Sequence, residues 1–127
     1  MSNRRHVPHP WRLAELTYSD VQQEHYEVAV LPLGATEPHN LHLPYSMDTR
    51  EGDLVGDMIC EAAWRNGAKV ILLPTIPYGT ETNQREFPFA MNINPSTLQA
   101  MLADLIESLV HQGILKIVLL NSHGGND

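Results

Sequence analysis

Three short apolar runs, separated by longer segments with helical spacing, constrain the fold of this chain most. The runs read EVAVLPL at 27–33, KVILL at 69–73 and KIVLL at 116–120. The first is rich in β-branched residues and is followed at once by Gly34, as is typical of a buried strand. Because these runs are continuously apolar, we expect parallel strands that are covered on both faces.

The segments between these runs have the apolar spacing of helices. In residues 49–66 the apolar positions are Leu54, Val55, Met58, Ile59, Ala62 and Ala63, and Asn66-Gly67 supplies the stop. A second helix begins at Asn94-Pro95 and ends at Gly113, with an expected buried stripe of Leu98, Met101, Leu102, Leu105, Ile106, Leu109 and Val110. A short helix is expected at 17–24. The order β–α–β–α–β predicts a three-layer α/β/α fold with a mainly parallel sheet and right-handed crossovers.

Length and composition restrict the classes of protein that this chain can belong to. Its 127 residues suit one domain, with residues 1–26 as an N-terminal arm and short helix and 27–127 as the α/β domain. The net charge of −7, with scattered cations, argues against nucleic acid and anionic membrane as partners. The single cysteine, Cys60, permits no internal disulfide, and its apolar helical context indicates a core thiol. With no signal peptide and no apolar run of ~20 residues, we expect a cytoplasmic protein.

Polar residues follow the predicted strands, at the edge where parallel sheets place their sites. The segment 34–48 holds Glu37, His39, His42 and Asp48, and His123 follows the third strand. Loops after different strands can converge, so carboxylates and imidazoles would share one pocket. Oxygen and nitrogen ligands of this kind suit Zn, Mn or Fe.

Each of these residues also has a structural interpretation. Asp48 could cap the following helix, and Glu37 and His39 could be ordinary loop residues. The remaining histidines, at 6, 9, 25 and 111, are expected to be solvated. The pair Gly124-Gly125 could let the backbone approach a ligand or could form a plain turn, and no phosphate-binding glycine motif is present.

Two segments resemble signatures of the creatininase (creatinine amidohydrolase) family. The run PLGATEPHNLHLP at 32–44, with Asp48, resembles the pattern P-x-G-[SA]-x-E-Q-H-G-x-H-L-P-x-x-x-D. The run NSHGGN at 121–126 is similar to G-H-G-G-N after a strand. Tyr78-Gly79 and Phe87-Pro88 stand in the place of the family's Y-G…F-P-G-T loop, so the resemblance extends from about residue 27 to the end.

The resemblance implies a metal-dependent amidohydrolase that acts on non-peptide C–N bonds, of the cyclic amide or formamide type, through a metal-activated water. By match, the metal ligands would be Glu37, His39, Asp48 and His123, with Asp48 bridging two divalent ions (Zn, Mn or Fe). His42 would stand beside the ligands in a supporting role. The substrate-binding residues would be Tyr78, Phe87 and Asn126, and the substrate a small-molecule amide. A homo-oligomer, hexameric by resemblance, is also implied.

The sequence departs from the family pattern at several positions. Pro38 and Asn40 replace the usual Gln and Gly, and Phe89-Ala90 replaces the usual Gly-Thr, so creatinine itself is not implied as the substrate. Gly125 stands where creatininases proper have a Glu ligand, which relatives with His-Gly-Gly supply from a later segment. We therefore expect an apparently truncated, N-terminal half of a creatininase-like fold.

Two other functions stay open at this point. The chain could be a non-catalytic metal-binding or assembly fragment of such an enzyme, inactive alone. It could also be a nucleotide-binding half-domain, which the acidic loop and the missing phosphate motif disfavour.

Overall fold

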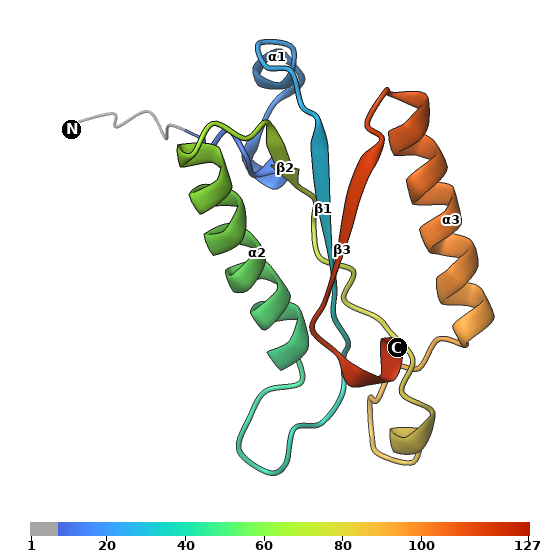
Figure 1. The fold of residues 1–127 in the computed structure, drawn as a ribbon. Helices are drawn as coiled ribbons and strands as arrows, with labels where there is room; N and C mark the ends of the chain where they lie inside the picture. Colours follow the sequence, from blue (N-terminus) through green and yellow to red (C-terminus); the bar gives the residue numbers. More distant parts are fainter. Residues whose placement is uncertain (1–7) are drawn as a thin grey trace.

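A computed structural model describes residues 8–127, which form a three-stranded parallel sheet with a long helix on each face (Figure 1). The strands are β1 (Val28–Leu33), β2 (Val70–Leu72) and β3 (Lys116–Asn121), and they lie side by side in the order β2-β1-β3. The long helices are α2 (Met47–Arg65) and α3 (Pro95–His111). The short helical segments are α1 (Tyr18–Val21) and three 3₁₀ turns, η1 (Leu13–Glu15), η2 (Thr82–Gln84) and η3 (Gly124–Asn126). The predicted element order and the three-layer α/β/α fold are confirmed.

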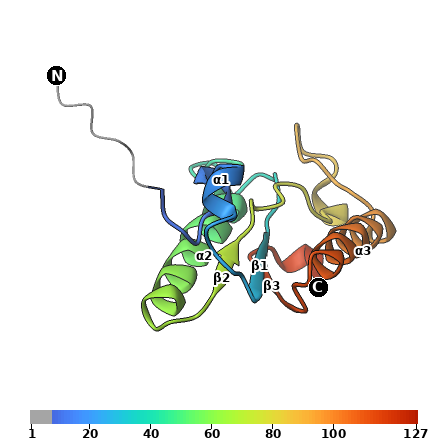
Figure 2. The same ribbon diagram turned by 90° about the horizontal axis from the view of Figure 1, so that it is seen from above.

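Neighbouring residues of β1 face opposite layers of the molecule. Val30 packs in a buried cluster with Trp11, Val70, Leu72 and Cys60 of α2. Ala29 packs on the other face with Ile71 of β2 and Leu109 of α3. Figure 2, which looks down on the sheet, shows α2 and α3 on its two sides. The continuous apolar character of the strands therefore reflects burial on both faces, as predicted.

The buried face of α2 is made mainly of small residues. Its buried positions are Asp48, Gly52, Gly56 and Cys60, one on each successive turn. A Cβ built on Gly56 would lie 2.8 Å from Cδ1 of Leu72, so the helix approaches the sheet too closely for a larger side chain. The apolar residues Leu54, Met58 and Ile59 are instead 63%, 62% and 47% exposed. The close approach of α2 to the sheet therefore selects glycine at the contact, and these larger apolar residues lie outside it.

The expected stripe of α3 is only partly buried. Leu98 and Leu109 are buried, whereas Leu105 and Val110 are exposed. The strand nearest to α3 in Figure 1 is β3, an edge strand whose Leu119 is 43% exposed. An apolar groove therefore runs between α3 and β3, lined in part by Leu102, Ile106 and Leu119.

Part of the segment expected to form an arm is docked on the sheet. The N–H of Leu72 donates to the carbonyl of Trp11 over 2.6 Å, and the indole N–H of Trp11 donates to Oδ1 of Asp57 over 2.8 Å.

Residues 1–7, which include His6, lie outside the described residues. His9 pairs with Glu15 over 2.7 Å, while the side chains at 25 and 111 are exposed as expected. Within the described chain, no helix is long and apolar enough to cross a bilayer.

Cys60 is completely buried, which confirms its assignment to the core. Burial, and to a smaller extent the charge of Asp57, raises the pKa of its thiol to about 11. A thiol in that environment stays protonated at neutral pH and is a poor nucleophile.

Candidate metal centre

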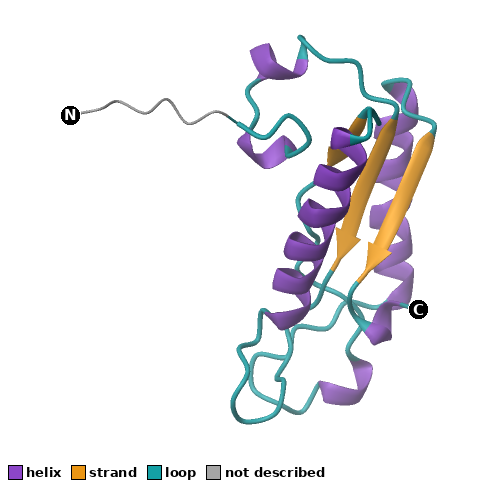
Figure 3. Ribbon diagram, turned by 60° about the vertical axis from the view of Figure 1, so that its left-hand side comes forward, coloured by secondary structure: helices purple, strands orange, loops and turns teal. Residues whose placement is uncertain are grey.

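The loops that follow the three strands meet at the carboxyl edge of the sheet, below the arrowheads in Figure 3. Oγ of Ser122, after β3, lies 2.9 Å from the carbonyl oxygen of Leu33 and 2.7 Å from that of Asp48. The side chain of Asn126 accepts a hydrogen bond from the N–H of Thr80 over 3.0 Å and donates to the carbonyl of Gly34 over 3.2 Å. These bonds hold the predicted site segments together.

His39 faces the carboxylates of Glu37 and Asp48. Its Nε2 atom lies 2.9 Å from Oδ1 of Asp48 and 3.8 Å from Oε1 of Glu37. Its other ring nitrogen, Nδ1, lies 3.1 Å from the carbonyl oxygen of Glu37. Since a carbonyl only accepts hydrogen bonds, Nδ1 carries a proton and points Nε2 at the carboxylates.

His123 has the same arrangement, with its ring nitrogens exchanged. Nδ1 lies 2.8 Å from Oδ2 of Asp48 and 3.1 Å from Oε1 of Glu37. Nε2 donates to the carbonyl of Thr80 over 2.9 Å. The four residues that the resemblance marks as ligands are therefore adjacent in space, and Asp48 offers one oxygen to each imidazole.

This geometry requires a cation between the rings and the carboxylates. A neutral imidazole whose one N–H is held by a carbonyl presents a lone pair on its other nitrogen. Here that lone pair would face carboxylate oxygens unless a proton or a metal ion lies between them. Oδ2 of Asp48 is buried and has no hydrogen-bond partner, even though Nδ1 of His123 is 2.8 Å away. Histidines held by carbonyls in this way are typical of metal sites, so the residues fit a divalent cation.

The capping interpretation of Asp48 is wrong. Ser46 occupies the N-cap position of α2, Asp48 lies within the first turn, and no side-chain cap hydrogen bond is present. Asp48 is 7% exposed because it continues the buried face of α2 over the end of the sheet.

Without a metal, burial and the crowded charges shift the acidity of two of these groups. Burial raises the pKa of Glu37, an effect that the neighbouring His123 opposes and the Asp48 charge reinforces. Burial by itself would lower the pKa of His39. The hydrogen bond to the Glu37 carbonyl and the negative charge of Asp48 outweigh that effect, and the pKa is raised. Both shifts favour a bound proton where a metal cation would otherwise lie.

Sequence reasoning missed a third carboxylate, Glu81, which follows β2 and immediately precedes η2. Glu81 is 0% exposed, and Oε1 accepts a hydrogen bond from the N–H of Thr36 over 3.1 Å. Its Oε2 atom is buried without a hydrogen-bond partner. Burial, and then the charge of Glu37, raises its pKa to about 7. The available signal was the length of the loop 74–95, since long loops in small domains are often functional.

Among residues 8–127, two sets of three side chains are arranged closely enough to hold an ion. One oxygen or ring nitrogen from each of Glu37, His39 and Asp48 lies within 4.8 Å of the others, and the same holds for Glu37, Glu81 and His123. Neither set includes His42, whose side chain is exposed.

A pocket adjoins these groups on the loop side. It is lined by Pro38, Asn40, Leu41, Tyr45, Gln84 and Phe87. Gln84 joins the pocket to the carboxylates, because its Nε2 donates to Oε2 of Glu37 over 2.9 Å. Of the predicted substrate-binding residues, Phe87 lines this pocket, whereas Tyr78 and Asn126 do not. The amide of Asn126 is instead bonded to the backbone.

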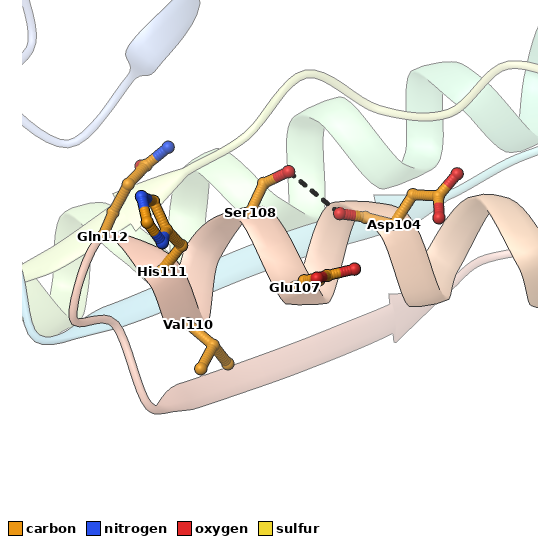
Figure 4. Close-up of a pocket in the computed structure, with 6 residues that line it drawn as sticks. All are labelled: Asp104, Glu107, Ser108, Val110, His111 and Gln112. Carbon is orange, nitrogen blue, oxygen red and sulfur yellow. Dashed lines mark hydrogen bonds between the residues drawn. The ribbon is translucent and has the colours of Figure 1, made fainter.

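A second pocket, shown in Figure 4, lies on α3, away from these groups. Its lining residues are Asp104, Glu107, Ser108, Val110, His111 and Gln112. The hydroxyl of Ser108 donates to the backbone carbonyl of Asp104 over 2.9 Å, which is an ordinary contact within a helix. Because one helix and its C-terminal cap supply the whole lining, this hollow has no convergent polar groups of a kind that suits catalysis.

Comparisons with known proteins agree with this geometry. A mycofactocin precursor peptide peptidase from Mycolicibacterium smegmatis is 30% identical over 123 residues, which cover 96% of this chain and 49% of the relative. A creatinine amidohydrolase from Pseudomonas putida is 30% identical over 105 residues, covering 78% of this chain and 38% of the relative. The chain thus spans half or less of the length of these relatives.

Solved structures share the fold. A proposed creatinine amidohydrolase from Bacteroides fragilis superposes with a TM-score of 0.84 at 36% identity, over 95% of this chain and 49% of the other. A creatininase with Mn gives a TM-score of 0.75 at 27% identity, over 92% and 47% of the two chains. The profile of the Creatininase family, described as creatinine amidohydrolase, matches residues 14–127. The chain therefore belongs to the Creatininase family.

Proposed function

We propose that this chain carries the metal centre of a metal-dependent amidohydrolase, with Glu37, His39, Asp48 and His123 as ligands of a pair of divalent ions, Zn, Mn or Fe. The observation that supports this proposal most is the matched setting of the two imidazoles. Each keeps one ring nitrogen on a backbone carbonyl and turns the other to the buried carboxylates.

The residues of the chain would have separate tasks in such a centre. Asp48 would bridge the ions, since its two oxygens already face different imidazoles. Gln84 would hold the Glu37 carboxylate in place, and the carbonyls of Glu37 and Thr80 would fix the imidazole tautomers. Bound divalent ions would supply Lewis acidity for an amide carbonyl and a water of lowered pKa.

The substrate is an amide whose C–N bond is broken, which is the chemistry shared by the peptidase and the creatinine amidohydrolase among the relatives. Within that class we favour a small non-peptide amide, cyclic or of the formamide type, with Phe87 and Tyr45 lining its pocket. Two further roles in substrate contact, for Tyr78 and Asn126, stay predictions, as does the homo-oligomer.

The proposal is tested with the chain loaded with Mn²⁺ or Zn²⁺ and offered a cyclic amide, a formamide and a short peptide. We expect metal-dependent hydrolysis of one of the first two substrates, seen as ring opening of the cyclic amide or as release of formate and amine from the formamide, and its loss in Asp48→Asn. Glu51→Gln, at an exposed position one turn further along α2, is the matched control and should keep the activity of the parent chain.

Two results would redirect the proposal. Cleavage of the peptide alone would exclude the non-peptide class. Tight metal binding with no turnover of any amide would favour the alternative, a metal-binding or assembly fragment that is inactive alone.

A further inference from the structure

We propose that Glu81 is a metal ligand and completes, with Glu37 and His123, the position of the second divalent ion. This inference rests on the proposed metal centre and adds a ligand to it from the loop after β2. The three side chains offer one ligating atom each within 4.8 Å of one another.

The Glu81 carboxylate is buried with one of its oxygens unpartnered. The side chain is completely buried, and one oxygen is fixed by the N–H of Thr36 over 3.1 Å. The second oxygen, Oε2, has no partner, although it is enclosed by protein. A buried carboxylate oxygen without a hydrogen-bond donor is unfavourable unless a cation neutralises it. The unpartnered lone pairs of Oε2 therefore indicate a place for a cation.

Backbone hydrogen bonds place Glu81 next to His123. The N–H of Glu81 donates to Oδ1 of Asn92 over 2.7 Å, which fixes the residue from its backbone side. The preceding residue, Thr80, accepts from Nε2 of His123 over 2.9 Å and donates to Asn126 over 3.0 Å. The contact that orients the imidazole of His123 therefore also sets the position of Glu81.

Gly125 packs directly against the loop that carries Glu81. A Cβ at this position would overlap the carbonyl oxygen of Thr80 and would lie 2.6 Å from Nε2 of His123. The segment 124–126 is thus packed against the loop after β2 and has no room for a side chain at Gly125. In the described structure Glu81 supplies a further carboxylate near His123, in addition to those of Glu37 and Asp48.

Glu37 connects the two proposed ion positions. Its Oε1 atom lies 3.8 Å from Nε2 of His39 and 3.1 Å from Nδ1 of His123, so it stands between both imidazoles. Glu37 belongs to both sets of ligating atoms, one completed by His39 and Asp48 and the other by Glu81 and His123. Three carboxylates held this close are mutually repulsive, and a pair of divalent cations balances them better than one.

The competing explanation is a structural one, in which Glu81 keeps a proton and serves only to hold Thr36. The variant Glu81→Gln separates the two. Its amide oxygen can still accept from the N–H of Thr36, but the anionic ligand is gone. The matched control is Glu86→Gln, which removes an exposed carboxylate from the same loop.

The experiment is a calorimetric titration of the chelator-treated chain with Mn²⁺ alone, followed by electron paramagnetic resonance of the loaded samples. We expect two Mn²⁺ per parent chain and a magnetic coupling between them. We expect Glu81→Gln to retain one Mn²⁺ and to bind the second at least 10-fold more weakly, with loss of the coupling. Glu86→Gln should resemble the parent chain.

A second variant guards against a simple folding defect. Glu81→Asp keeps the negative charge but withdraws the carboxylate by one methylene, so it should also weaken the second ion while circular dichroism stays that of the parent. Unchanged Mn²⁺ stoichiometry and affinity in a folded Glu81→Gln would overturn the assignment and leave the metal centre of the other four residues standing. Loss of both ions would also contradict it, because Glu81 would not then serve one position. A parent chain that binds no Mn²⁺ would overturn both proposals.

Discussion

Oδ2 of Asp48, in the first turn of α2, lies 2.8 Å from Nδ1 of His123, which follows β3. Two features of the fold produce this contact. The small residues Gly52 and Gly56 let α2 lie close to the sheet, so its first turn projects over the carboxyl ends of the strands. The parallel pairing of β1 with β3 delivers His123 to the same edge. The contact therefore depends on helix packing as much as on the ligands themselves.

Divalent metal should stabilise the folded chain. An ion that binds only the native state raises the free energy of unfolding by about 2.7 kcal/mol when its concentration is 100 times its dissociation constant. We expect Mn²⁺ or Zn²⁺ to raise the melting temperature of the chelator-treated chain by several degrees in differential scanning calorimetry. Mg²⁺, which prefers oxygen ligands, should have a smaller effect. Equal melting temperatures with and without Mn²⁺ would argue against a formed site.

Gly125 should not tolerate a side chain. A Cβ there would overlap the carbonyl of Thr80, so Gly125→Ala must move either His123 or the segment that carries Glu81. We expect a loss of about 1–3 kcal/mol in the free energy of unfolding from overpacking, together with weaker metal binding. The matched control is Gly124→Ala, because nothing lies within 4 Å of a Cβ at Gly124. Urea denaturation of both variants measures this difference. Equal free energies of unfolding for Gly125→Ala and Gly124→Ala would contradict the packing explanation.

Gln84 should affect the metal without binding it. Its amide holds Oε2 of Glu37 at 2.9 Å, so Gln84→Leu leaves that carboxylate free to turn. Losing a group that orients a ligand costs roughly 10–100-fold in metal affinity. We expect this range for Mn²⁺ in a competition assay with a chelator. The neighbouring Asn83→Leu, at an exposed position, should stay near the affinity of the parent chain.

The N-terminal segment should become less stable in acid. Hydrogen bonds from the side chain and backbone of His9 lower the pKa of Glu15 from 4.5 to about 2. Since this pKa is depressed in the folded state, its stabilising effect is present above pH 4.5 and is lost as the pH falls towards 2. Glu15→Gln should therefore flatten the dependence of the unfolding free energy on pH in this range. Identical slopes for the variant and the parent chain would contradict the role assigned to this pair.

The sequence predicted the elements of the fold better than the faces that they bury. The continuous apolar runs and the signals at Asn94-Pro95 and Gly113 depend on local chemistry, so strands and helices were placed within a few residues. The buried face of α2 was not predicted, because a search for apolar spacing picks out large side chains. Close packing on the sheet selects Gly52 and Gly56 instead. The exposure of Leu105 follows from the edge position of β3, which no local pattern reveals.

In the candidate site, too, the sequence predicted the residues that stand in a local pattern and not the one that does not. Glu37, His39, Asp48 and His123 stand in recognisable signatures after two strands, and the structure brings them together. Glu81 has no such signature, because a buried glutamate and a solvated one look alike in a sequence. Its place became evident only from the contact between Thr80 and His123.

We propose that this chain by itself holds divalent metal between the two imidazoles and the buried carboxylates. Elemental analysis of the purified, dialysed chain, expressed as metal per chain, tests it most directly. We predict two equivalents of Zn, Mn or Fe, lost in Asp48→Asn and kept in Glu51→Gln. A well-folded chain that retains no metal, or one whose metal content is unchanged in Asp48→Asn, would contradict the account.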